Sequence, residues 1–127
     1  MLYTVYRGLT DLAAPLVPYV LERRRAAGEE DPDRQGERLG VASRSRPAGR
    51  LIWVHGASVG EALSAQVLIR RALEADPSAS VLLTTGTVTS AAMMASRLPE
   101  RAIHQFVPVD RMPFVRRFLD HWRPDLA

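Results

Sequence analysis

The fold is decided by residues 51–75, which read LIWVHGASVGEALSAQVLIRRALEA. The stretch opens with an apolar, strand-forming run that ends at Gly56. From Gly60 to Ala75 apolar residues recur at the spacing of a helix, and Asp76-Pro77 then stops the pattern. The segment therefore predicts a short buried strand that leads through a turn into an amphipathic helix.

The same alternation continues along the chain. We expect further strands over 81–85 and 103–107, and further helices over 89–98 and 113–122. Strands that alternate with helices in this way form right-handed βαβ units around a parallel sheet. Strands that are apolar throughout suit a sheet covered on both faces. The predicted fold class is α/β, a parallel sheet with flanking helices.

The C-terminal residues predict a continuation. Residues 123–127 read as a connection into a fourth strand, and the sequence stops there. Three parallel strands would leave an open edge and one poorly covered face. We therefore expect residues 51–127 to be an incomplete domain.

Residues 1–25 predict a membrane-associated helix with a basic end. Arg7 and Asp11 interrupt the apolar opening, and because they are four residues apart they can pair on one helix face. The uninterrupted stretch 12–21 would reach about 15 Å as a helix, half of a bilayer core, and its two prolines would kink it. These features favour a helix in the membrane interface over a spanning helix, with Arg23-Arg24-Arg25 at anionic head groups. A helix that packs on the rest of the protein is the alternative.

The polar segment 26–50 reads as a linker with one short helical turn, in which the acidic run 29–33 is a solvated loop. The 127 residues contain no cysteine, which excludes disulfides and thiolate metal sites. The 17 basic residues are all arginines, but they are scattered, and aromatic residues make up only 6%. Since nucleic-acid binding calls for a basic stripe with aromatic platforms, we expect no nucleic-acid partner.

Three turns are candidates for a ligand site, because ligands of open parallel sheets bind beyond the carboxyl ends of the strands. The turn 55–61 is the richest. Gly56 and Gly60 permit a tight turn and the close approach of a ligand. Ser58 and Glu61 have the spacing of a capping box, in which each side chain satisfies a backbone N–H at the helix start. Alternatively, Glu61 is a general base, since a helix N-terminus stabilises an ionised carboxylate.

The other two turns carry hydroxyl and carboxylate groups. Thr85, Gly86 and Thr87 precede a helix and suit a phosphate or a sugar hydroxyl, although Thr87 also fits a simple N-cap. Asp110 follows the third expected strand. It either orients a substrate hydroxyl or serves the start of the helix at Pro113.

Nothing in the sequence calls for a metal or a cofactor. The histidines, His55, His104 and His121, are far apart, and hydrogen-bonded structural roles are favoured for them. The turn 55–61 lacks the Gly-x-Gly-x-x-Gly pattern of dinucleotide sites and the lysine of phosphate loops. We therefore expect no metal ion, nicotinamide or ATP at this site.

Several motifs, in order along the chain, resemble those of the Kdo (3-deoxy-D-manno-octulosonic acid) transferase family. The similarity covers essentially the whole chain, which makes it far more specific than any single turn. Its parts are the apolar opening 1–21, RQGERLG at 34–40, WVHGASVGE at 53–61, TTGTVTS at 84–90, PVD at 108–110 and RFL at 117–119.

This resemblance implies an inverting glycosyltransferase with two Rossmann-like domains (the GT-B architecture). CMP-Kdo would be the donor and a lipid A precursor the acceptor, with no metal. Glu61 matches the glutamate that accepts the proton of the acceptor hydroxyl, and the apolar opening matches an anchor at the cytoplasmic face of the inner membrane. The family continues into a Glu-x-Glu-Leu-Trp-Pro motif and a CMP-binding domain that these residues lack, so we expect this chain alone to be inactive.

Two other functions remain as alternatives. One is a non-catalytic, membrane-associated α/β binding module, in which Glu61 only caps a helix. The other is a transferase of the same architecture that uses a different sugar-nucleotide donor, because the donor site would lie in the missing domain.

Overall fold

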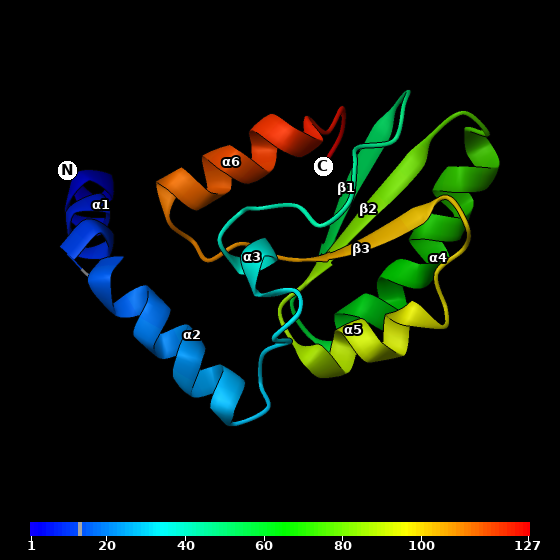
Figure 1. Cartoon of the computed structure of the whole chain (residues 1–127). Helices are drawn as coiled ribbons and strands as arrows, with labels where there is room; N and C mark the ends of the chain where they lie inside the picture. Colours follow the sequence, from blue (N-terminus) through cyan, green and yellow to red (C-terminus); the bar gives the residue numbers. More distant parts are fainter. Residues whose placement is uncertain (13) are drawn as a thin grey trace.

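The computed structural model describes residues 1–12 and 14–127. A sheet with helices on both sides carries an arm of helices at the N-terminus (Figure 1). The elements are α1 (Leu2–Leu12), η1 (Ala14–Leu16), α2 (Val17–Ala26), α3 (Gln35–Arg38), β1 (Leu51–Gly56), α4 (Val59–Ala75), β2 (Ser80–Thr85), α5 (Val88–Ala95), β3 (Ala102–Phe106) and α6 (Met112–Trp122). The predicted α/β alternation after residue 50 is confirmed, as is the short helical turn in the polar segment.

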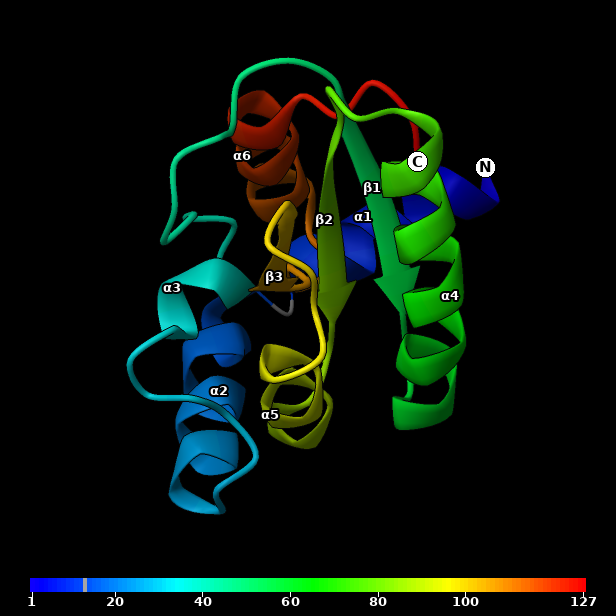
Figure 2. The same ribbon diagram turned by 90° about the vertical axis from the view of Figure 1, so that its right-hand side faces the viewer.

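The sheet is parallel, with its strands in the order β1-β2-β3. One face packs Leu83 against Ile69 of α4 and Met94 of α5. The opposite face packs Leu82 against Phe118 of α6. Figures 1 and 2 show the resulting layers, with α6 on one side of the sheet and α4 and α5 on the other. Helices therefore cover both faces, as the apolar strands predicted.

Local sequence explains where the helices stop. α4 ends at Ala75, directly before Asp76-Pro77, as predicted, and Asp76 takes an extended conformation. α5 ends at Ala95, earlier than predicted. The carbonyl of Met94 there accepts the amides of residues 97 and 98, each at 3.0 Å, and this turn closes the helix before Pro99.

Each outer strand of the three-stranded sheet makes a few contacts at its free edge with other described residues. At the edge of β3, Glu37 Oε1 accepts from the amide of Phe106 at 2.8 Å, and Arg34 Nη2 donates to the carbonyl of His104 at 3.0 Å. The two side chains thus occupy the place of a neighbouring strand. At the edge of β1, Leu126 forms an isolated parallel bridge with Ile52.

The N-terminal helices form an arm that projects from the α/β body (Figure 1). The predicted kink is confirmed, because η1, which contains Pro15, separates α1 from α2, and Pro18 lies in the first turn of α2. The predicted pairing of Arg7 with Asp11 lies outside the description, which does not cover the Arg7 side chain. Within the described residues no helix has both the length and the apolar character needed to cross a bilayer.

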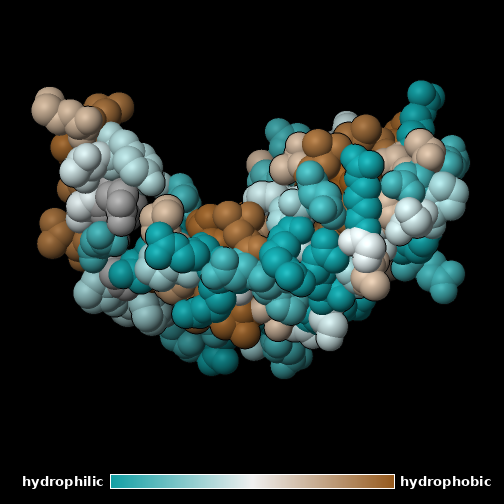
Figure 3. Space-filling model, turned by 90° about the horizontal axis from the view of Figure 1, so that it is seen from above, coloured by the Kyte–Doolittle hydropathy of each residue, from teal (hydrophilic) through white to brown (hydrophobic). Residues whose placement is uncertain are grey.

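Apolar side chains are exposed along this arm, and Figure 3 shows them from above. Those of α1 are Leu2, Tyr3, Val5, Tyr6, Leu9 and Leu12, with exposed fractions from 46% to 89%. The alternative of a helix that simply packs on the protein therefore leaves much of this apolar surface in water.

The expectation of a solvated acidic run is wrong for Glu30, which is buried. Glu30 Oε1 accepts from Arg24 Nε at 2.8 Å and lies 3.5 Å from Arg38 Nε. Two arginines from different helices thus neutralise this carboxylate. Arg24 belongs to the triple-arginine segment, so part of that segment is paired within the chain.

Candidate functional site

The carboxyl ends of the three strands meet at one edge, where α4 and α5 begin. In Figure 2 the strand arrowheads point down to this edge. The structure brings the candidate residues of all three turns to it. Ser58, Gly60, Glu61, Thr87 and Asp110 are exposed, Gly86 is half-buried and Thr85 is buried. This edge, which we call the shelf, therefore presents exposed hydroxyl and carboxylate groups.

Glu61 is held by the backbone at the start of α4. Its Oε2 accepts from the amide of Ala57 at 2.6 Å, and its own amide donates to Ser58 Oγ at 3.2 Å. The predicted reciprocal capping is confirmed, with the carboxylate reaching one residue beyond the N-cap Ser58. Only one carboxylate oxygen takes part in these contacts, and the side chain is exposed. The other oxygen is thus available to a ligand at the shelf.

The glycines of the site fall into two groups. A Cβ at Gly56 would lie 2.9 Å from the amide nitrogen of Ala62, so glycine is required there for α4 to pack on β1. A Cβ at Gly60 would meet only Ser58 Oγ, at 3.9 Å, and one at Gly86 only Val107 Cγ1, also at 3.9 Å. Both of the latter positions would accept a side chain without strain. Their open space is compatible with the close approach of a ligand.

The hydroxyls of the second turn divide between cap and core. Thr87 is the N-cap of α5, and its Oγ1 accepts from the amide of Ser90 at 3.1 Å. The N-cap interpretation of Thr87 is therefore confirmed, while its exposure leaves it within reach of a ligand. Thr85 is buried, and its Oγ1 lies 2.7 Å from His104 Nε2. Its hydroxyl is directed into the protein rather than to the shelf.

A partly buried network beneath the second turn was not predicted from the sequence. Arg34 donates to both oxygens of Glu37, through Nε and Nη2, at 2.8 Å each. Arg34 Nη2 also lies 3.0 Å from His104 Nδ1. Because guanidinium groups only donate, Nδ1 is the acceptor, and His104 Nε2–H donates to Thr85. Burial and the Arg34 charge lower the pKa of His104 to about 4, which keeps the ring neutral.

The role of this network is to tie the end of β2 to the end of β3. The Arg-x-x-Glu spacing of Arg34 and Glu37 was the available signal, since residues three apart face one side of a helical turn. The partners on β3 are Phe106, 69 residues from Glu37, and His104, 70 residues from Arg34. The local sequence pattern carries no information about them.

Asp110 is fixed by the N-terminal arm. Its Oδ2 accepts a hydrogen bond from the hydroxyl of Tyr6 in α1. This bond and the negative carboxylate raise the pKa of Tyr6. The N-cap of α6 is Arg111, without a side-chain capping bond, so the capping interpretation of Asp110 is wrong. The site residue Asp110 instead connects the shelf to α1.

The three histidines have separate environments. His55 Nδ1 lies 2.9 Å from Thr84 Oγ1, and His121 Nε2 lies 2.8 Å from the carbonyl of Arg44. All three histidines, including His104, thus take part in hydrogen bonds within the protein, as predicted. In the described part of the chain no three His, Asp or Glu side chains form a group that could hold a metal.

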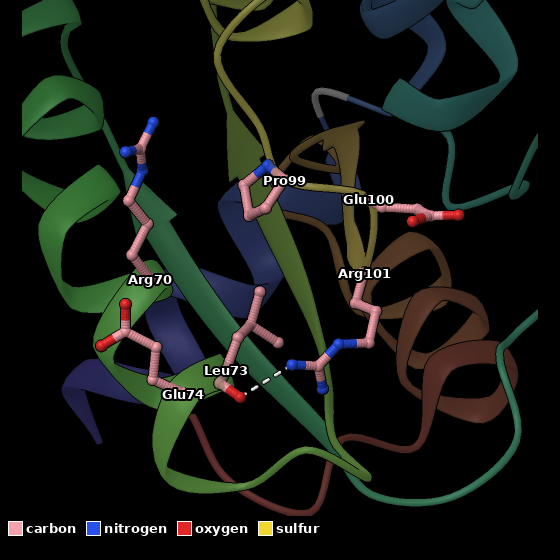
Figure 4. A pocket seen from close by; sticks show the side chains of 6 residues that line it. All are labelled: Arg70, Leu73, Glu74, Pro99, Glu100 and Arg101. Carbon is pink, nitrogen blue, oxygen red and sulfur yellow. Dashed lines mark hydrogen bonds between the residues drawn. The ribbon is translucent and has the colours of Figure 1, made fainter.

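A separate hollow lies at the amino-terminal ends of the strands, near the end of α4 (Figure 4). Arg101 crosses it and donates to the carbonyls of Leu73, Pro77 and Ala79, each at 2.7 Å. These bonds satisfy carbonyls at the end of α4 and in the loop that follows it. The hollow is therefore a structural feature, remote from the carboxyl ends of the strands.

Comparison with known proteins supports the resemblance seen in the motifs. The family described as 3-deoxy-D-manno-octulosonic-acid transferase (kdotransferase) matches residues 33–127. A probable mitochondrial 3-deoxy-D-manno-octulosonic acid transferase of Arabidopsis thaliana is 39% identical over 123 residues, covering 97% of this chain and 28% of that protein. The 3-deoxy-D-manno-octulosonic acid transferase of Rickettsia bellii is 34% identical over 123 residues, 97% of this chain and 29% of its own length.

The similarity extends to a more distant relative. The transferase of Haemophilus influenzae is 28% identical over 124 residues, 96% of this chain and 29% of its own length. The chain thus spans under a third of these three relatives. No solved structure matches it significantly.

Proposed function

Because the chain belongs to the 3-deoxy-D-manno-octulosonic acid (Kdo) transferase family, we propose that it forms the acceptor-side part of an inverting glycosyltransferase. The donor is CMP-Kdo and the acceptor a lipid A precursor. The enzyme has two Rossmann-like domains, and the described α/β body belongs to the first. The donor-binding residues lie in the second domain, so we expect transfer from the full-length protein and not from these 127 residues alone.

Glu61 is the general base of this mechanism. Its free oxygen accepts the proton of the acceptor hydroxyl as that hydroxyl attacks the anomeric carbon of Kdo. The bond from this carbon to the phosphate oxygen breaks, and CMP leaves with the electron pair. Attack from the side opposite CMP inverts the anomeric configuration. The observation that supports this role is the position of Glu61, which is exposed at the carboxyl edge with one oxygen fixed by Ala57.

The test compares Glu61→Gln with Glu74→Gln in the full-length protein. Both glutamates are exposed on α4, but Glu74 lies in its last turn, at the opposite edge of the sheet. CMP release from CMP-Kdo in the presence of acceptor should fall at least about 100-fold for Glu61→Gln, the usual range for loss of a general base, and stay unchanged for Glu74→Gln. Full activity of Glu61→Gln would refute Glu61 as the base. Absence of CMP release from the unmodified full-length protein would favour the non-catalytic module, and transfer from another donor would favour the second alternative.

We further propose that α1 lies in the interface of the cytoplasmic face of the inner membrane. The exposed apolar side chains of this helix support the proposal. Leu9→Glu should weaken binding to anionic phospholipid vesicles. The control is Val67→Glu on α4, because Val67 is 59% exposed and Leu9 62%. Equal binding by both variants would contradict an interfacial α1.

A further inference from the structure

A buried hydroxyl orients His55 at the end of β1. Thr84 is fully buried, and its Oγ1 lies 2.9 Å from Trp53 Nε1 and 2.9 Å from His55 Nδ1. Register places His55 directly opposite Thr84, and Trp53 is two residues earlier on the same face of β1. The three side chains therefore form one hydrogen-bonded chain that ends at the carboxyl edge.

The direction of these hydrogen bonds follows from the groups involved. An indole N–H only donates, so Trp53 uses one lone pair of the Thr84 oxygen. The hydroxyl proton of Thr84 then requires an acceptor, because an unsatisfied buried donor costs about 1–3 kcal/mol. Among the described contacts His55 Nδ1 is the group that can accept it. A neutral imidazole whose Nδ1 accepts carries its proton on Nε2.

With Nδ1 of His55 engaged by Thr84, Nε2 is the ring nitrogen that remains for a ligand. His55 is exposed, whereas Thr84 and the β2 residues beside it are buried. Its backbone lies next to Gly56 at the start of the turn that carries Glu61. The Nε2–H donor of His55 therefore lies at the same edge of the sheet as the carboxylate of Glu61, to which we assign the proton transfer.

We infer that His55 is a further substrate-binding residue, which donates from Nε2–H to an oxygen of the acceptor saccharide. This inference rests on the proposed function, because it takes the acceptor to bind beside Glu61. Trp53 and Thr84 are positioning residues that act through the tautomer of His55. The requirement for a defined tautomer explains why the hydroxyl of a buried threonine, itself held by a tryptophan N–H, is bonded to an exposed histidine.

The first test is NMR of the imidazole nitrogens in this chain. We expect a protonated Nε2 and an unprotonated Nδ1 for His55, and a mixture of tautomers in Thr84→Val, which keeps the shape of the side chain but removes the hydroxyl. Addition of a deacylated lipid A precursor saccharide should shift the Nε2 resonance of His55. A proton on Nδ1, or no shift at saturating saccharide, would overturn the inference without reference to catalysis.

The second test is steady-state kinetics of the full-length protein. His55→Ala should raise KM for the acceptor about 3- to 10-fold, the usual value of one hydrogen bond, with little change in KM for CMP-Kdo. His55→Gln can place an amide N–H near the position of Nε2 and should recover most of the loss. A rise in the donor KM alone, or an unchanged acceptor KM, would refute the assignment. Full activity of Glu61→Gln would instead refute the proposed base and leave the NMR result to decide the role of His55.

Discussion

The substitution Glu37→Gln tests the network that closes the edge of β3. The Glu37 carboxylate is buried and accepts four hydrogen bonds, at 2.6 to 2.8 Å. Two come from Arg34, one from Ser43 Oγ and one from the amide of Phe106. Glutamine keeps the shape of the side chain but replaces one oxygen by an NH₂ group. We therefore expect a specific loss of acceptor capacity and charge.

The size of the effect follows from the partners. The glutamine carbonyl can still accept from Phe106 and from one nitrogen of Arg34, and Ser43 can rotate to accept from the new NH₂ group. The second Arg34 nitrogen would then face a donor, and the arginine charge would lose its counter-charge. Removal of one member of a buried ion pair costs about 3–5 kcal/mol. Because the Arg34 side chain is 29% exposed, water can solvate it in part, so we expect about 3 kcal/mol.

The measurement is urea unfolding of this chain, followed by circular dichroism. Glu29→Gln is a matched control, because Glu29 is 58% exposed and 3.7 Å from Arg24, and it should change the free energy of unfolding by less than about 0.5 kcal/mol. Hydrogen exchange should also show faster exchange of the Phe106 amide in Glu37→Gln. A loss below about 1 kcal/mol, or equal to that of Glu29→Gln, would refute the assigned role of the network.

Three further outcomes are expected. Gly60→Ala should raise the free energy of unfolding by about 0.4–1 kcal/mol, since a Cβ there meets no close atom. In the full-length protein the same variant should raise KM for the acceptor, and unchanged kinetics would argue against ligand approach at Gly60. Ser58→Ala should lower the free energy of unfolding by about 1 kcal/mol in urea unfolding, because it removes the cap of α4. The pKa of His104 in the folded chain is lowered to about 4. As the pH falls, this histidine is therefore protonated in the unfolded chain before it is protonated in the folded chain. Stability should therefore be full above about pH 6.5 and decline toward pH 4 by at most about 3 kcal/mol, and urea unfolding of His104→Gln should show a smaller decline.

Much of the α/β body was predictable because its signals are local. Apolar runs bounded by Gly56, by Gly86 and by the Asp76-Pro77 pair fix where strands and helices begin and end. Because the strands do not alternate apolar and polar residues, they predicted that helices cover both faces of the sheet. The early end of α5 was not predictable in the same way, because a turn at Met94 closes the helix before Pro99.

The candidate site was predictable where it depends on turn position and not where it depends on distant partners. Parallel strands bring their carboxyl ends together, so Ser58, Glu61 and Thr87 could be assigned to one edge. The burial of Glu37 and Glu30 was not apparent, because a polar segment reads as loop whatever packs against it. Both carboxylates are neutralised by arginines, and for Glu37 the decisive partner, Phe106, is 69 residues away.

The two interpretations of Glu61 are compatible, and one substitution separates them. A capping bond engages one carboxylate oxygen with Ala57 and so fixes the direction of the other. In Glu61→Gln the amide carbonyl can still accept from Ala57, so the helix start and the free energy of unfolding should be largely preserved. The same variant lacks a carboxylate that can take a proton. If Glu61 only caps α4, Glu61→Gln is therefore silent in both stability and turnover; if it is also the base, turnover alone collapses.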